Sequence, residues 1–204
     1  MQANNAPESG EYVVILGAAG GLGLVAIQIA KALGLVVIAV TNSGKKKEAC
    51  KRFGADLVLD SDDNWQDAAR AYTRNNRGVD IVLDPLGMVD RSLRCIAWNG
   101  RIVVIGFAAG AIEKIAMNKI LLKNCSISGV FWGRYATEEP ETVVKVWDEL
   151  ILFMKQGSIR PTVYSDEKFT GLQSLPRVFG IMAKGEAWGK IAIAVEEDDI
   201  TSRL

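Results

Sequence analysis

The chain has 204 residues, of which 49% are hydrophobic, and its 24 basic residues are balanced by 24 acidic ones. This length and composition predict one large domain, or one domain followed by part of a second. The balanced charge gives no basis for binding a nucleic acid or an anionic membrane, and the apolar runs are too short to cross a bilayer. Because the sequence contains no histidine, imidazole cannot serve as a catalytic base or a metal ligand.

The three cysteines are widely spaced, and none belongs to a CxxC pair. Cys50, Cys95 and Cys125 lie in apolar or helical contexts, which favours reduced, buried thiols over disulfides or a zinc site. The N-terminal residues are too polar for a signal peptide. We therefore expect a cytoplasmic protein without a bound metal.

The first elements expected along the chain are a buried strand, a glycine-rich turn and a helix. Tyr12 to Leu16 is a short apolar run, typical of a strand covered on both faces, and the helix-forming run after the turn ends at Gly34. Glycines let a backbone approach a pyrophosphate, and a helix start offers unpaired N–H groups and a positive dipole end. This order predicts a dinucleotide site. The candidate glycines are Gly17, Gly20, Gly21 and Gly23.

The second expected strand, Leu35 to Val40, bears on the choice of cofactor. Sites selective for NAD usually place an acidic residue near this strand end to bind the ribose hydroxyls, but no carboxylate lies between Gly17 and Lys47. The sequence favours NADP, whose 2′-phosphate would be attracted by a lysine. The candidate contacts are Thr41, Asn42, Ser43 and either Lys45 or Lys46. The alternative is that these lysines form a solvated helix face, which we expect for Lys47.

Strands and helices continue to alternate along the next part of the chain. This alternation predicts a doubly wound parallel α/β sheet of about six strands, a Rossmann fold. The turns after the strands, at 17–23, 41–46, 84–87 and 106–110, should line one crevice. The further strands are expected at 56–59, 79–83, 100–106 and 125–130. The helices are expected at 45–53, at 64–75 after an acidic cap at 61–63, from 88 to about 97, and at 114–123.

The character of the sequence changes from Thr137. We expect a long amphipathic helix from Glu138 to Gln156, an edge strand from Ile159 to Tyr164, a helix from Gln173 to Lys184, and a last strand from Lys190 to Val195. This is a C-terminal β-α-β extension. The predicted organisation is an N-terminal stub at 1–10, a dinucleotide-binding domain at 11–136, the extension at 137–196 and an acidic tail at 197–204.

Short motifs along nearly the whole chain match those of one family in order and spacing. They are Ser9-Gly10-Glu11, Ala18 to Gly23, Lys46 through Phe53 to Asp56, Val79 to Gly87, Asn99-Gly100-Arg101 to Gly106, Leu122-Lys123-Asn124 to Val130, and Gly189 to Ala192. In this pattern the chain resembles the medium-chain dehydrogenase/reductase superfamily, closest to its zinc-independent, zeta-crystallin-like quinone reductases.

The resemblance implies NADPH-dependent hydride transfer to a quinone, an enone or another carbonyl compound. It places the pyrophosphate on the backbone from Ala19 to Leu22 and the 2′-phosphate on Lys46. The loops beside the nicotinamide would be Gly106–Phe107 and the segment of Val130, Phe131 and Trp132. Asp84, in the turn at 84–87, is a further candidate in the expected crevice. Ser61 stands where the family often has a tyrosine near the 2′-phosphate. No catalytic residue can be named.

The resemblance also bears on assembly and completeness. Related proteins usually dimerise by joining sheets edge to edge, which here implies a homodimer through the strand at Cys125–Val130. The alternative is that the helix from Glu138 covers this strand. The family carries a GroES-like catalytic lobe before the cofactor domain, whereas only about ten residues precede the first strand here. A non-catalytic NADP-binding module or subunit, or a fragment, is therefore the alternative to an enzyme, with 137–196 as a remnant of the lobe.

A rival motif is typical of the short-chain dehydrogenases. Gly17-x-x-x-Gly21-x-Gly23 matches their turn, and Tyr164 and Lys168 match their Tyr-x-x-x-Lys pair, in which the lysine lowers the tyrosine pKa for acid–base catalysis. That family needs the pair on a helix, but here it follows Pro161 and an expected strand. We regard this interpretation as the less favoured one.

Overall fold

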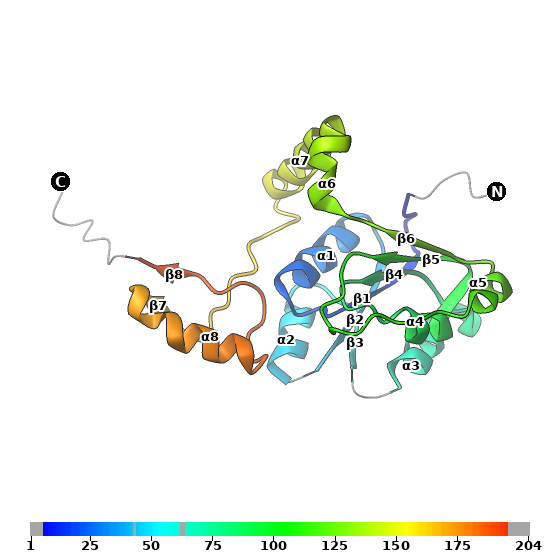
Figure 1. The fold of residues 1–204 in the computed structure, drawn as a ribbon, viewed down its shortest axis with the longest axis horizontal. Coiled ribbons are helices and arrows are strands. Elements are labelled where there is room, and N and C mark those ends of the chain that lie inside the picture. Colours follow the sequence, from blue (N-terminus) through cyan, green and yellow to red (C-terminus); the bar gives the residue numbers. More distant parts are fainter. Residues whose placement is uncertain (1–5, 43, 62–63, 196–204) are drawn as a thin grey trace.

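The computed structural model describes residues 6–42, 44–61 and 64–195 and is built around a six-stranded parallel sheet (Figure 1). The strand order is β3-β2-β1-β4-β5-β6, which confirms the predicted doubly wound Rossmann sheet. Ser43 and the predicted acidic tail lie outside the described residues. The strands are β1 (Tyr12–Leu16), β2 (Val36–Thr41), β3 (Leu57–Asp60), β4 (Val79–Asp84), β5 (Ile96–Val104) and β6 (Ser126–Gly129).

Helices cover both faces of this sheet. Helices lie on either side of it (Figure 1), and a further helix follows β5. They are α1 (Gly21–Ala32) and α2 (Gly44–Arg52) on the first face, α3 (Trp65–Tyr72) and α4 (Val89–Cys95) on the second, and α5 (Met117–Lys123). A short 3-10 turn, η1 (Arg74–Asn76), follows α3.

Strand β1 shows why its sequence has no polar alternation. Val13 and Ile15 belong to the buried cluster that contains Leu24 of α1, while Val14 belongs to a second buried cluster with Trp65 of α3. Successive side chains of a strand point to opposite faces. Both faces of β1 therefore contribute to a core, and the continuous apolar run is the result.

Two of the predicted helices have other boundaries in the structure, and for the longer one the physical reason is clear. The helix expected from Glu138 to Gln156 is divided into α6 (Trp132–Glu138) and α7 (Pro140–Lys155). Glu139 between them has φ −142° and ψ 60°, because a residue that precedes proline is forced out of the helical region. The predicted domain boundary after residue 136 falls within α6. The helix expected to reach Ala97 instead ends at Cys95, and β5 begins at the next residue.

The C-terminal part forms a small β-α-β unit that stands off from the main sheet (Figure 1). It consists of β7 (Phe169–Thr170), the 3-10 turn η2 (Leu172–Ser174), α8 (Leu175–Ala183) and β8 (Ile193–Ala194). This confirms the predicted extension, but the strand predicted from Ile159 to Tyr164 is wrong. Only Val163 forms a bridge, with Lys190. The Arg160 N–H donates instead to Gln28 Oε1 at 2.9 Å, and Pro161 has no N–H to offer a ladder.

The three cysteines are free thiols. Cys50 and Cys95 are buried, and burial raises the pKa of each thiol to about 12, so both are inert at neutral pH. Cys125 is partly exposed. Within the described ranges, no helix combines the length and the apolar character needed to span a bilayer.

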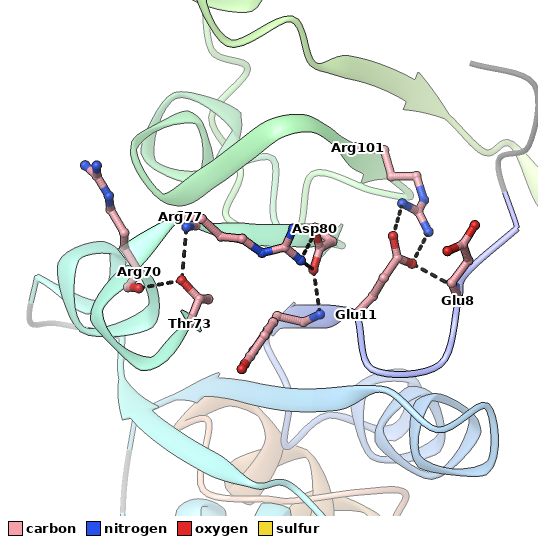
Figure 2. A network of polar contacts seen from close by, with 9 residues as sticks. Glu8, Glu11, Arg70, Thr73, Arg77, Asp80 and Arg101 are labelled. Carbon is pink, nitrogen blue, oxygen red and sulfur yellow. Dashed lines mark hydrogen bonds and ion pairs between the residues drawn. The ribbon is translucent and has the colours of Figure 1, made fainter. Parts of the chain in front are cut away.

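A polar network at the amino ends of the strands fixes the entry into the sheet (Figure 2). Arg101 of β5 donates two hydrogen bonds to the Glu11 carboxylate, at 3.0 and 2.6 Å. Asp80 accepts a hydrogen bond from the Tyr12 N–H at 2.8 Å and one from Arg77 at 2.7 Å. Glu11 and Arg101 are only 20% and 14% exposed. The ion pair therefore holds β5 to the segment that enters β1.

This ion pair predicts a pH-dependent contribution to stability. Burial pushes the pKa of Glu11 upwards, but the hydrogen bonds from Arg101 and from the Glu8 N–H, together with the charges of Arg101 and Arg77, outweigh it and leave this pKa below its usual value of 4.5. The stabilisation is thus present above the unfolded-state pKa and is lost as pH falls through the folded-state pKa. We expect Arg101→Ala to lower the free energy of unfolding at neutral pH by roughly 1.5–3 kcal/mol.

Urea unfolding of the parent and the variant at several pH values measures this effect. The difference between the two proteins should narrow as pH falls below the usual value for Glu11. Arg94→Ala, which removes an exposed arginine of α4, is the matched control and should have little effect. Equal unfolding midpoints for the parent and Arg101→Ala at neutral pH would contradict the assignment.

Candidate cofactor-binding site

A cavity of about 290 Å³ opens at the carboxyl ends of β1 and β2. It brings together the glycine turn after β1, the end of β2, the first turn of α2 and the loop after β4. Several of the residues predicted to bind a dinucleotide therefore share one wall. The lining residues are Gly17, Ala19, Gly20, Val40, Thr41, Asn42, Lys46, Ser61, Leu86 and Ala187.

The geometry of the turn requires its glycines. Gly17 has a φ of +57°, a conformation that side chains with a Cβ rarely adopt. A Cβ on Gly23 would lie 2.5 Å from the Ala18 carbonyl oxygen, so only glycine lets α1 start this close to β1. No side chain caps the start of α1 at Gly20. The N–H groups of its first turn and its positive dipole end are thus left for an anionic ligand.

The three consecutive lysines of α2 have three different environments. Lys45 forms an ion pair with Asp166 at 3.1 Å. Lys47, which we expected to be solvated, is only 33% exposed and pairs with Asp60 at 2.5 Å. Lys46 lines the cavity, and its Nζ donates to Asn42 Oδ1 at 3.2 Å. Lys46 is therefore the lysine placed to meet an anion in the cavity.

Asp84 has a different place from the predicted one. Its side chain is fully buried. One carboxylate oxygen accepts hydrogen bonds from the N–H groups of Leu86 and Gly87, at 2.9 and 2.8 Å, and the other accepts one from Met88 at 2.7 Å. Asp84 does not line the cavity. It shapes the loop after β4, which carries Leu86 into the cavity wall.

The residues expected beside the nicotinamide lie at the same edge of the sheet but outside this cavity. A Cβ on Gly106 would lie 3.1 Å from the Pro85 carbonyl oxygen, and one on Gly87 would meet the Phe107 ring. The loops after β4 and β5 are thus in contact. Val130 follows β6, Phe131 is 73% exposed, and Trp132 stacks on Tyr135 with ring centroids 5.5 Å apart.

The C-terminal segment at 187–190 reaches the glycine turn, and the sequence did not reveal this. Ala187 lines the cavity, and the Gly189 N–H donates to the Ala19 carbonyl oxygen at 2.8 Å. The aliphatic part of the Lys190 side chain lies over Gly21, where an added Cβ would meet its Cε at 2.4 Å. Gly189 and Lys190 belong to a motif that the family shares, which does not indicate where they lie in the fold. No local pattern could indicate contact with a turn so distant in sequence.

A second, mainly apolar hollow of about 470 Å³ lies on the other side of the turn. It runs along α1 towards the carboxyl ends of β4 and β5. Its lining includes Gly21 and Leu22, which are predicted to contact the pyrophosphate, together with Lys190. The lining residues are Gly21, Leu22, Val25, Ala26, Ile29, Leu83, Ile105 and Lys190.

The short-chain dehydrogenase interpretation is wrong. Neither Tyr164 nor Lys168 is in a helix. Tyr164 packs against Trp188, with ring centroids 5.6 Å apart. Burial and the charge of Asp166 raise its pKa, whereas a catalytic tyrosine of this type needs a lowered pKa.

Comparisons with known proteins point to one family. A family model described as zinc-binding dehydrogenase matches residues 21–150. Quinone oxidoreductase-like protein 2 from Mus musculus is 32% identical over 193 residues, which cover 93% of this chain and 54% of the mouse protein. The chain spans about half the length of the curated relatives it matches.

Two solved structures extend the comparison. A probable oxidoreductase from Mycobacterium abscessus matches with a TM-score of 0.77 and 34% identity, over 92% of this chain and 55% of that one. The Escherichia coli quinone oxidoreductase complexed with NADPH matches with a TM-score of 0.79 and 25% identity, over 92% of this chain and 58% of that one.

Proposed function

We propose that this chain binds NADPH and transfers its hydride to a quinone or an enone. The chain belongs to the zinc-binding dehydrogenase family and forms the cofactor-binding part of a medium-chain dehydrogenase/reductase. The observation that carries the proposal is the convergence of the glycine turn and Lys46 on one cavity. The NADPH complex of the Escherichia coli relative and the names of the curated relatives support the choice of cofactor and substrate class.

The metal in the family's description does not fit the residues of this chain. The sequence has no histidine. Across the described part of the chain, Cys, Asp and Glu side chains do not gather in groups of three or more that could hold a metal ion. We assign no step to zinc.

The chain's own residues supply binding and orientation. The first turn of α1 would hold the pyrophosphate, Lys46 the 2′-phosphate, and Thr41 and Asn42 the ribose beside it. Lys190 lies over Gly21, so its cationic side chain would add charge near the pyrophosphate. When bound, NADPH supplies the hydride chemistry itself. The protein would fix its position and shield it from water on the side closed by the segment at 187–190.

The cofactor assignment predicts a selective effect of Lys46→Ala. A charge-assisted contact with phosphate is worth roughly 1.5–3 kcal/mol, so the Kd for NADPH should rise about tenfold to a hundredfold. The Kd for NADH, which lacks the 2′-phosphate, should change little. Titration of the purified chain with each nucleotide by calorimetry measures both constants. Lys51→Ala, an exposed lysine on the same helix, controls for net charge. Equal affinity of the parent for both cofactors would refute the role of Lys46.

The enzyme assignment predicts that the purified chain oxidises NADPH when p-benzoquinone or cyclohexenone is added. The loss of the absorbance of the reduced nicotinamide measures turnover, and reactions without the acceptor and without the protein are the controls. NADPH binding without turnover would instead favour the second candidate, a non-catalytic NADP-binding module or subunit. One observation supports that candidate. Trp147, Ile151 and other apolar residues of α7 are exposed, and none of its residues is buried.

We also propose a homodimer through β6, which lies at the edge of the sheet. The Val130 N–H donates to Val104 of β5 at 2.9 Å. Because N–H groups alternate in direction along a strand, that of Ile127 points to the open edge. An unpaired edge invites pairing with another chain. The alternative cover, α7, has no buried residue.

Ile127→Pro should convert the dimer to a folded monomer, because it removes an N–H donor at the open edge and leaves the bonds to β5 in place. Light scattering measures the molar mass, and circular dichroism checks the fold. Ser128→Pro is the contrasting variant, since its N–H points towards β5 and its loss should destabilise the strand itself. A monomeric parent, or a dimer that survives Ile127→Pro, would rule out this interface.

A further inference from the structure

The Asp166 side chain links the start of α2 to the segment that closes the cofactor cavity. Its Oδ2 pairs with Lys45 Nζ at 3.1 Å, and its Oδ1 accepts a hydrogen bond from Trp188 Nε1 at 3.0 Å. Both partners stand next to residues of the cavity wall, because Lys45 precedes Lys46 and Trp188 follows Ala187. One carboxylate therefore contacts two parts of the site from outside it.

Trp188 is firmly held. It is 3% exposed and packs against Phe53, with ring centroids 6.4 Å apart. The Arg52 guanidinium lies 4.4 Å from the centroid of its ring, a cation–π contact. The hydrogen bond to Asp166 satisfies its only polar group. Trp188 thus anchors the segment that places Ala187 and Gly189 over the glycine turn.

Lys45 is held in a different way. Its side chain is 72% exposed, while that of Asp166 is 26% exposed, so the ion pair lies at the rim of a separate hollow of about 500 Å³. The hydrogen bond and charge of Asp166 raise the pKa of Lys45, and the hydrogen bond from Trp188 lowers that of Asp166. Lys45 therefore lines this separate hollow and not the cavity that Lys46 lines.

We propose that Asp166 is a specificity-determining residue, which limits the preference for NADPH by holding Lys45 away from the 2′-phosphate. The proposal rests on the proposed binding of NADPH beside Lys46. Without Asp166, two consecutive lysines would be available to one phosphate, and a nearby negative charge would be gone. The same carboxylate positions Trp188, so its two oxygens have separable roles.

Asp166→Asn separates these roles, because the amide keeps an oxygen that can accept from Trp188 but loses the charge that pairs with Lys45. We expect the Kd for NADPH to fall by roughly two- to fivefold, the range of an exposed charge interaction, and the Kd for NADH to stay the same. The gain should shrink at high salt, because added ions screen the freed lysine. A merely structural role would change both constants together and without this salt dependence.

Two further variants complete the test. The double variant Asp166→Asn with Lys45→Gln should return the NADPH affinity to that of the parent. Glu167→Gln is the matched control. It removes the same charge one residue later, from a carboxylate that pairs with Arg177 at 2.6 Å, and should leave the ratio of the two Kd values unchanged.

The outcomes distinguish this inference from the function on which it rests. If the parent binds NADPH more tightly than NADH and Asp166→Asn leaves the ratio unchanged or lowers it, the inference fails and the proposed cofactor stands. An equal gain in Glu167→Gln, or a gain that persists in the double variant, would also overturn it. If the parent binds neither nucleotide, both proposals fall.

Discussion

The close contact between α1 and β1 governs the rest of the site. Because Gly23 brings α1 against the backbone of Ala18, the helix starts directly at the end of the strand, and its first N–H groups meet the crevice. The loop after β4 packs against the same turn. Leu86, in the loop shaped by Asp84, lies 3.4 Å from where a Cβ of Gly17 would be. A wider separation of α1 and β1 would move the first N–H groups of α1 away from the cavity that Gly17, Ala19 and Gly20 line.

Ion pairs determine which charged side chains of this molecule are neutralised and which remain available. Equal counts of acidic and basic residues could have left the crevice without any positive charge. Instead, Lys45 forms an ion pair with Asp166 and Lys47 forms one with Asp60. Of these three consecutive lysines, only Lys46 lines the cavity. At the opposite end of the strands, Glu11 and Arg101 neutralise each other in a mostly buried pair. The amino end of the sheet is thus closed by an internal ion pair, while at the carboxyl end the Lys46 cation lines the cavity.

Most of the fold could be predicted from the sequence, because strands buried on both faces are apolar throughout and the glycine turn has a local geometric cause. The predictions failed where distant partners decide. The segment from Ile159 to Tyr164 has strand-forming residues, but the Arg160 N–H is used by Gln28. The residue types alone left Lys45 and Lys46 as alternatives, and only the family resemblance favoured Lys46. The residue that separates them in the structure is Asp166, which pairs with Lys45 and is distant in sequence. Ala187 and Lys190 join the site through a contact with the glycine turn that no local pattern encodes.

The hydrogen bond from Gly189 to Ala19 has a consequence for energetic coupling. It fastens a late segment of the chain to a carbonyl group of the turn whose N–H groups would hold the pyrophosphate, so docking of that segment and occupation of the turn involve neighbouring groups of one backbone. Free energies of binding are reciprocal. If docking of this segment strengthens nucleotide binding by some free energy, nucleotide binding must stabilise the docked segment by the same free energy. The small C-terminal unit, which has few buried residues of its own, would thereby be stabilised by the proposed nucleotide, which it would meet through Ala187 and Lys190.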